Sequence, residues 1–165
     1  MKELRFAVAL EASIRKELED INRQALPELC PVVQIVSKFQ AEFELLLDRA
    51  CSTDVDLGKY PEIDAALLLG SDQDWQQAVK NFSDTNNKAL ANLTLLWRVL
   101  ALIENSQQYY QQAALNSPYP LTKLFLSSLT QTKLILRRRL DGVLRAMYNE
   151  VWSSVGFAPF VFGKD

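Results

Sequence analysis

The sequence predicts an all-α protein, an antiparallel four-helix bundle with one long connection and a short extra helix between the second and third long helices. In four long segments, apolar residues recur at alternating steps of three and four, the spacing of one face of a packed helix. Proline-bearing turns join the two members of each pair. The chain has only 5 Gly and 6 Pro, too few for the many turns of an all-β fold. We therefore expect helix to exceed about 60% of the chain, against roughly one-third in ordinary globular proteins.

The first pair of helices falls within residues 4–51. The first apolar stripe comprises Leu4, Ala7, Glu11, Ile14, Leu18, Ile21 and Ala25. Leu26-Pro27 ends this helix, because the residue before a proline disfavours the helical conformation. Pro31 suits the first turn of the next helix. The stripe of this second helix comprises Val33, Val36, Gln40, Phe43, Leu47 and Ala50.

Residues 52–71 differ in composition and predict a loop that contains a short apolar turn at 63–69. Ser71 and Asp74 have the spacing of a capping box, in which each residue satisfies a backbone N–H of the other. They therefore predict the start of a short helix, which Trp75, Val79 and Phe82 would anchor.

The second pair of long helices falls within about residues 88–153, with a turn at 116–120. The predicted stripe of the third long helix comprises Leu93, Trp97, Leu100, Glu104, Gln107, Gln111 and Ala114. The stripe of the fourth comprises Phe125, Leu129, Thr132, Leu136, Leu140, Val143 and Met147.

Length and composition predict one soluble globular domain spanning 1–165, and they exclude several classes of function. The chain has 165 residues, is 48% hydrophobic and carries a formal charge of -2. It contains no His, which excludes Ser-His-Asp and Cys-His catalysis and histidine-based metal sites. Cys30 and Cys51, at either end of one helix, are expected to be free thiols. No stretch has the length of a signal-peptide core or a membrane span, so we expect a cytoplasmic protein with no membrane partner.

The C-terminal segment is rich in aromatic residues. The tail, residues 152–165, contains four large aromatic side chains: Trp152, Phe157, Phe160 and Phe162. Large apolar groups gathered in this way are seldom left in water. We expect the tail to dock on the bundle or on a partner subunit.

One stretch of the chain combines several motifs of a known kind. The run Ile103 to Ala114 combines a glutamate with the aromatic pair Tyr109-Tyr110, and Leu124-Phe125 opens the helix after the turn. In these residues the chain resembles the rubrerythrin branch of the ferritin-like superfamily. The resemblance covers residues 90–150 and, more loosely, 4–50. It implies a ferritin-like bundle, and it matches the two isolated glutamates of the family to Glu11 and Glu104.

The resemblance also implies that the metal chemistry of the family is lost. The Glu-x-x-His motifs have no counterpart, since Glu42 is followed at the third position by Leu45, and Thr132 by Ile135. We expect no metal, no cofactor and no catalytic residues, with Glu11, Glu42 and Glu104 as vestigial metal ligands. In place of a metal we expect a polar relic with Gln40, Gln107, Thr132 and the stems of Lys or Arg as hydrogen-bond donors. Replacing Glu11 and Glu104 by Gln should then be neutral or stabilising.

Three consecutive arginines make the predicted fourth long helix basic. Arg137, Arg138 and Arg139, together with Lys133 and Arg145, are candidates for binding an anion such as phosphate or nucleic acid. Three consecutive helical residues spread over about 200° of the helix, so they do not form one focused patch. A solvated face paired with acidic neighbours is the favoured interpretation, and a nucleic-acid partner is not expected.

The sequence leaves three hypotheses of function. The leading one is a non-enzymatic ferritin-like bundle without a working di-iron site, which acts through contacts with another protein or with itself as a homodimer. The second is a metal-binding or redox protein with an all-carboxylate cation site built from Glu11, Glu42 and Glu104. The third is an anion-binding module that uses the three arginines.

Overall fold

The computed structural model describes residues 2–52, 60–80, 82 and 88–154. Of these residues 88% are helical and none lies in a strand, so the predicted all-α class is confirmed. The helices are α1 (Lys2–Gln24), α2 (Cys30–Ser52), α3 (Ala65–Leu69), α4 (Asp72–Lys80), α5 (Lys88–Asn116) and α6 (Pro120–Ser154). None of the helices in these ranges is long and apolar enough to cross a bilayer.

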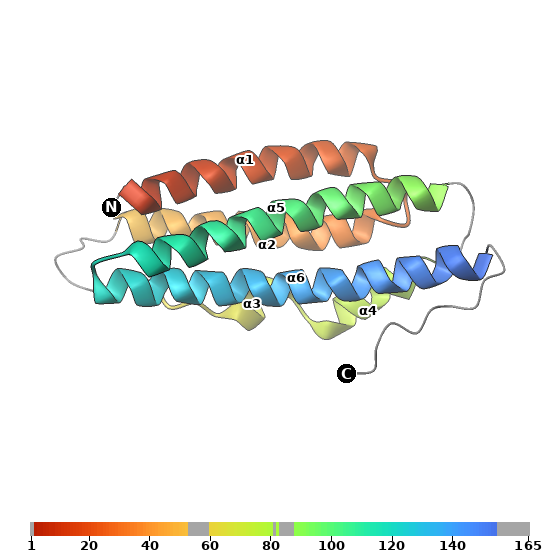
Figure 1. Ribbon diagram of the computed structural model, residues 1–165. Helices are drawn as coiled ribbons and strands as arrows, with labels where there is room; N and C mark the ends of the chain where they lie inside the picture. Colours follow the sequence, from red (N-terminus) through yellow and green to blue (C-terminus); the bar gives the residue numbers. More distant parts are fainter. Residues whose placement is uncertain (1, 53–59, 81, 83–87, 155–165) are drawn as a thin grey trace.

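The four long helices lie side by side as two hairpins (Figure 1). Helix α1 runs against α2, and α5 runs against α6, with the two members of each hairpin in opposite directions. Helix α5 begins at the end of the molecule opposite to the end of α2, so these two helices run in the same direction. The short helices α3 and α4 pack against α2, and α4 also contacts α6. The connection between the hairpins therefore runs along the length of the molecule.

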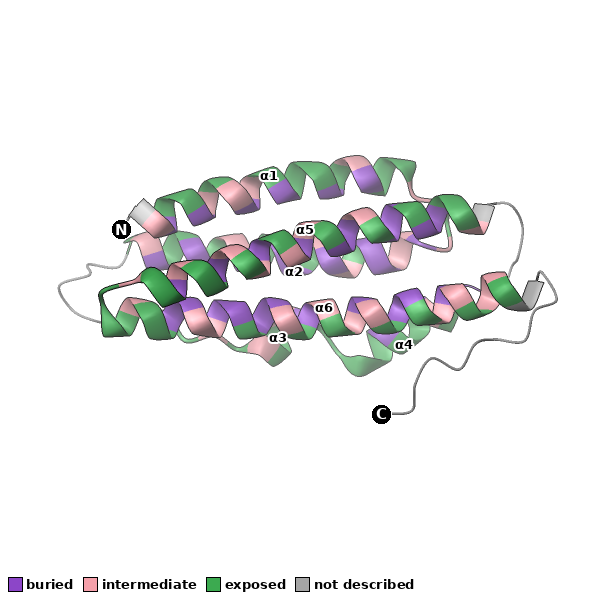
Figure 2. Cartoon of the chain, in the orientation of Figure 1, coloured by how far each residue is buried: buried purple, intermediate pink, exposed green. Residues whose placement is uncertain are grey.

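The apolar core lies where the inner faces of the long helices meet, as the buried residues in Figure 2 show. The predicted stripes of α2 and α6 are buried at every position, and that of α1 at every position except the half-buried Ala25. Spacings of three and four therefore identified the inner faces of these three helices correctly.

The predicted inner face of α5 is wrong by about one residue. Of its seven positions, Trp97 and Gln111 are exposed, and Glu104 and Gln107 are half-buried. The buried stripe is instead Leu96, Val99, Ile103, Ser106, Tyr110 and Ala114. One residue corresponds to about 100° of rotation about the helix axis. The N-terminal half of α5 carries leucine on several faces, so its periodicity is compatible with two stripes.

The predicted start of α4 is confirmed. The Asp74 amide donates to Ser71 Oγ at 3.2 Å, and the Ser71 amide and hydroxyl donate to Asp74 Oδ2 at 3.2 and 2.7 Å. Asp64 caps α3 in the same manner by accepting from the amides of Ala66 and Leu67. Gly70 joins the two helices with a φ of 71°, a conformation that residues with a Cβ rarely adopt.

Two further expectations concern the cysteines and the tail. Cys30 and Cys51 are free thiols, as predicted. Residues 155–165 of the predicted aromatic tail lie outside the described residues, so its docking stays a prediction. Within the tail, Trp152 is 39% exposed.

Replacing the two described glycines by alanine should have opposite effects. Gly70→Ala should lower the free energy of unfolding by about 1–3 kcal/mol, because the positive φ strains a side chain. Gly142→Ala is the matched control, since Gly142 lies inside α6 and a Cβ there meets no atom within 4 Å. It should raise the free energy of unfolding by about 0.5–1 kcal/mol. Urea unfolding followed by circular dichroism measures both changes, and equal effects would contradict the assignment of strain to Gly70.

Candidate functional site

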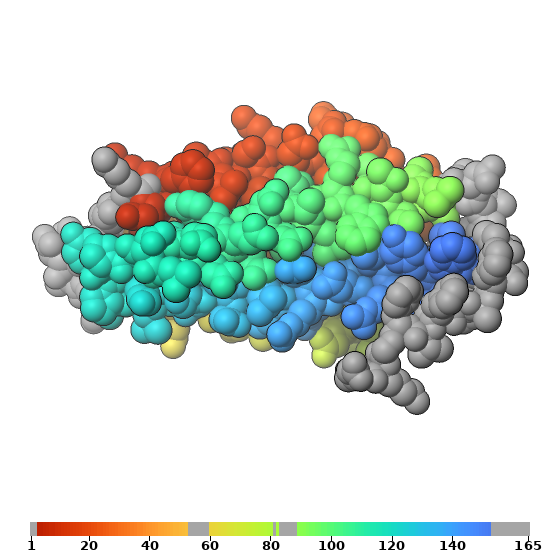
Figure 3. Space-filling model, in the orientation of Figure 1, coloured from red at the N-terminus to blue at the C-terminus, as the bar shows by residue number. Residues whose placement is uncertain are grey.

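An ion pair lies at the centre of the bundle. Lys133 Nζ from α6 lies 2.8 Å from Glu11 Oε2 of α1, and both side chains are completely buried. An isolated charge in such a place would lose most of its hydration free energy, so each of these groups requires the other. Figure 3 shows side chains of α1, α5 and α6 covering this face of the molecule, in agreement with the burial of the pair.

Both oxygens of the Glu11 carboxylate accept two hydrogen bonds. Oε1 accepts from Ser106 Oγ at 2.6 Å and from Tyr110 OH at 2.9 Å. Oε2 accepts from Gln40 Nε2 at 2.7 Å and from Lys133 Nζ. We call these five residues the Glu11 network. All four long helices contribute to it, and its charge-assisted hydrogen bonds use the acceptor capacity that the carboxylate has.

Lys133 has partners besides Glu11. Its ammonium donates to Gln40 Oε1 at 3.3 Å and lies 4.2 Å from the centre of the Phe43 ring and 5.3 Å from that of Phe39. A cation over the face of an aromatic ring is attracted to it, and the attraction is strongest away from water. The Lys133 ammonium is therefore stabilised both by oxygen atoms and by the faces of aromatic rings.

The network holds Glu11 in its ionised form. Burial raises the pKa of the Glu11 carboxyl, but the Lys133 charge and the hydrogen bonds from Lys133, Ser106 and Gln40 together bring the pKa below the ordinary value of 4.5. Burial also lowers the pKa of Lys133, against the opposing effect of the Glu11 charge. The pair is thus ionised at a net desolvation cost to the lysine, as is usual for buried ion pairs.

Of the three glutamates proposed as vestigial ligands, only Glu11 points into the bundle. Glu104 is half-buried at the edge of α5 and pairs with Arg137 at 3.2 Å, which corrects the expectation that it occupies the inner stripe. Glu42 is exposed and lines a groove between α2 and α3–α4. No three acidic or cysteine side chains of the described residues lie close enough together to hold a metal ion.

The arginines of α6 do not converge on one site. Arg137 pairs with Glu104 of α5, whereas Arg139 donates to Asp72 at 2.8 Å and to the carbonyl of Gly70 at 3.3 Å. Arg138 is exposed. Lys133, expected on the same basic face, is instead in the core. Two of the three arginines therefore connect α6 to its neighbours, as the favoured interpretation of the charges expects.

The predicted hydrogen-bond donors are correct in part. Gln40 donates to Glu11, and a lysine is indeed among the donors. Thr132 donates to the carbonyl of Ser128 in its own helix, and Gln107 Oε1 is buried without a hydrogen-bond partner. Because Lys133 pairs with Glu11, replacing Glu11 by Gln would leave a buried ammonium without its counter-charge, so this pair argues against the predicted neutral change.

The sequence contains a signal for the inward position of Lys133. Lys133 follows Leu129 by four positions and precedes Leu136 by three, the same spacing that defines the stripe of α6. Thr132 and Lys133 fit this level of the stripe equally well. A glutamate on an apolar stripe in a chain without histidine requires a positive charge, and that requirement would have favoured Lys133.

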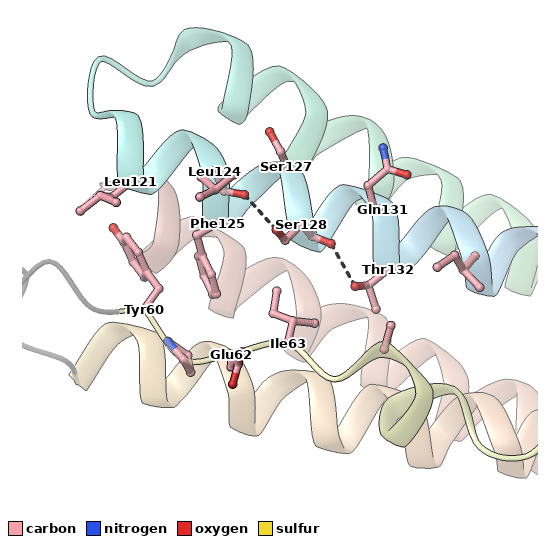
Figure 4. A pocket seen from close by; sticks show the side chains of 13 residues that line it. Tyr60, Glu62, Ile63, Leu121, Leu124, Phe125, Ser127, Ser128, Gln131 and Thr132 are labelled. Atoms are coloured by element: carbon pink, nitrogen blue, oxygen red, sulfur yellow. Dashed lines mark hydrogen bonds between the residues drawn. The ribbon is translucent and has the colours of Figure 1, made fainter.

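A surface groove of about 570 Å³ lies between residues 60–65 and the first half of α6 (Figure 4). Tyr60 stacks on Phe125 with ring centres 4.5 Å apart, and its hydroxyl lies 2.7 Å from Thr122 Oγ1. These two contacts hold the segment against the helix. The groove is lined by Tyr60, Pro61, Glu62, Ile63, Ala65, Leu121, Leu124, Phe125, Ser127, Ser128, Gln131, Thr132 and Ile135. Sequence reasoning did not find it, because periodicity does not show how 60–65 packs on α6.

Removing either member of the ion pair should destabilise the fold more than removing both. Glu11→Gln and Lys133→Met each leave one buried charge without a partner, which lowers the free energy of unfolding by about 3–5 kcal/mol. The double variant leaves none, and the Gln oxygen still accepts from Ser106 and Tyr110, so its loss should be smaller than that of either single variant. Urea unfolding of the four proteins measures the coupling. Additive losses would show that the two side chains act independently.

Stability should also decrease in acid because of Glu11. The folded pKa of this carboxyl lies below its unfolded value, so its contribution is fully present above about pH 4.5 and is lost as the pH falls through the folded pKa. The Glu11→Gln/Lys133→Met variant lacks this contribution and should lose less stability over the same range. Free energies of unfolding of both proteins between neutral pH and pH 3 test this, and parallel curves would contradict it.

Comparison with known protein families, with characterised proteins and with solved structures finds no match to this chain. The comparisons therefore assign the chain to no family.

Proposed function

We propose that this chain is a non-enzymatic ferritin-like helical bundle that has no functional di-iron site and acts through contacts with other protein molecules. The observation that carries the proposal is the complete use of the Glu11 carboxylate by Lys133, Gln40, Ser106 and Tyr110. Neither oxygen is left for a metal ion. A lysine ammonium stands where a metal centre would require a cation.

The arrangement of the helices supports a ferritin-like fold. Two hairpins, α1–α2 and α5–α6, are separated by one long connection, and α5 begins at the opposite end of the molecule from the end of α2 (Figure 1). A four-helix bundle with a single long crossover is the connectivity of ferritin-like proteins, whereas simple bundles use short loops throughout. This arrangement supports the antiparallel bundle that the sequence predicts.

The core does not favour the alternative of a carboxylate cation site. Di-iron bundles direct about four carboxylates and two histidines inward. Here Glu42 is exposed, Glu104 is paired with Arg137, and the chain contains no histidine. A cation that entered at Glu11 would also face the ammonium of Lys133. These features support a structural role for the Glu11 network. They favour a function that is carried out by residues on the surface.

The surface supports a role in protein contacts. Large apolar side chains are exposed along α6, where Leu121, Leu124 and Ile135 are 51%, 66% and 37% exposed and line the groove beside residues 60–65. Exposed apolar residues that occur singly need no explanation, but several of them gathered at one groove are typical of a binding surface.

Metal analysis tests the part of the proposal that concerns the core. Protein expressed with added iron and manganese and purified without chelators should contain either metal only at trace level. The Lys133→Met variant should be equally free of metal, because Glu42 and Glu104 do not reach Glu11. Plasma mass spectrometry measures both. Near-stoichiometric metal in the wild type that is abolished by Glu11→Gln would overturn the proposal and favour the carboxylate-site alternative.

A further inference from the structure

We propose that the groove between residues 60–65 and α6 binds the same groove of a second copy of this chain, with the two α6 helices antiparallel across a two-fold axis. The inference rests on the proposed role in protein contacts and names the partner.

A second stripe runs along α6 outside the core. Its members follow one another at steps of three and four, and we call them the α6 seam: Leu121, Leu124, Ser128, Gln131 and Ile135. All five line the groove, and Figure 4 shows four of them along one stretch of α6. Leu124 is the most exposed of its apolar members, at 66%. This spacing is the one by which two helices pack along a common seam.

Four members of the seam, those at 124, 128, 131 and 135, are complementary to themselves when reversed. If a two-fold axis passes midway between Ser128 and Gln131, Leu124 lies opposite the partner's Ile135, and Leu121, beyond this group, lies opposite the partner's exposed Arg138. Ser128 then lies opposite the partner's Gln131, and the symmetry repeats each pair once. The apolar pairs stand at the two ends and the polar pairs in the middle. An isologous interface requires this correspondence of each residue with its counterpart, which a single patch facing a different protein would not need.

The polar centre favours a second copy over an apolar helix from another protein. The Ser128 hydroxyl donates to the carbonyl of Leu124 at 3.1 Å, so its oxygen remains able to accept a hydrogen bond. The exposed Gln131 amide is a donor of the right kind. An apolar partner would bury both groups without a new bond, at a cost of about 1–3 kcal/mol for each. In the second copy the Gln131 amide donates to the Ser128 oxygen, a hydrogen bond that an apolar helix cannot supply, and a polar pair inside an apolar seam fixes the register.

The part of the groove lining that the structure describes carries little charge for recognising a charged ligand. Among these described residues Glu62 alone is charged, and the walls from 60–65 are otherwise Tyr60, Pro61, Ile63 and Ala65. Apolar patches with few charges are typical of the cores of homodimer interfaces. The stacking of Tyr60 on Phe125 sets this wall in place before a partner arrives.

Sedimentation equilibrium of the full chain tests the interface. The wild type should be a dimer at micromolar concentration. Leu124→Lys should raise the dissociation constant of the dimer by at least about 100-fold, because the charge is buried at two symmetric positions. Leu90→Lys is the matched control, since Leu90 is also highly exposed, at 61%, but lies on α5 outside the groove. This control should remain a dimer, and the circular dichroism of all variants should equal that of the wild type.

A charge exchange tests the register. In L124K/I135E each lysine faces a glutamate of the partner, so dimerisation should recover at least about tenfold relative to L124K/I135K, where like charges face each other. Within one helix the two positions are about 16 Å apart, too far for a direct ion pair inside one subunit. A monomeric wild type, an L124K protein that stays dimeric, or equal behaviour of the two double variants would each overturn the proposal. If the wild type is metal-free but monomeric, only this inference fails; if it is metal-loaded, the proposed function fails.

Discussion

The pairing of Glu11 with Lys133 is the interaction on which the packing of the long helices depends. A carboxylate in the core of a bundle must find a positive charge and enough donors, and here Glu11 of α1 receives donors from each of the other three long helices. Each helix therefore has to present one particular residue at one level of the bundle and on one face. Apolar contacts alone would tolerate small shifts and rotations, since they are not directional. The hydrogen bonds of the Glu11 network are directional, so they disfavour such shifts and rotations.

A buried ion pair is not an efficient means of stabilising a fold. Desolvation of both groups offsets much of their attraction, and apolar residues of the same volume would often serve as well. What the pair provides is discrimination against other arrangements, because a misplaced helix leaves a buried charge without a partner. In this respect Lys133 does for the bundle what a bound cation does in a metal-containing one: it balances the carboxylate from inside. A lysine differs from a metal in leaving no open coordination position where a reaction could occur.

The sequence predicts the helices and most of their inner faces correctly. The prediction fails where the apolar pattern is compatible with two different faces of a helix. The stripes of α1, α2 and α6 have one dominant apolar face, so the spacing identified it. In α5 leucines lie on several faces, and a stripe through Glu104 differs by one position from the buried one. Ser106, which faces the core, is not on that predicted stripe. Lys133 was missed because a basic residue beside three arginines was assigned to the surface with them.

The local capping of α4 by Ser71 and Asp74 was predictable because it involves neighbours in sequence. The packing of Tyr60 on Phe125 joins residues far apart in the chain and carries no local signal.

The core network and the proposed interface meet in one helix. Lys133 lies between Gln131 and Ile135 in sequence, and a separation of two residues turns a helix by about 200°, so Lys133 points inward where the other two face outward. The ion pair thus fixes the rotation of α6 about its own axis, and that rotation decides which residues form the α6 seam. Rotation of α6 by one residue would expose the Lys133 ammonium or bury the Gln131 amide. The first change would separate Lys133 from Glu11, and the second would remove the amide from water. The buried pair can therefore be important to function without touching a ligand, by holding the outer face of α6 in the orientation that a partner would recognise.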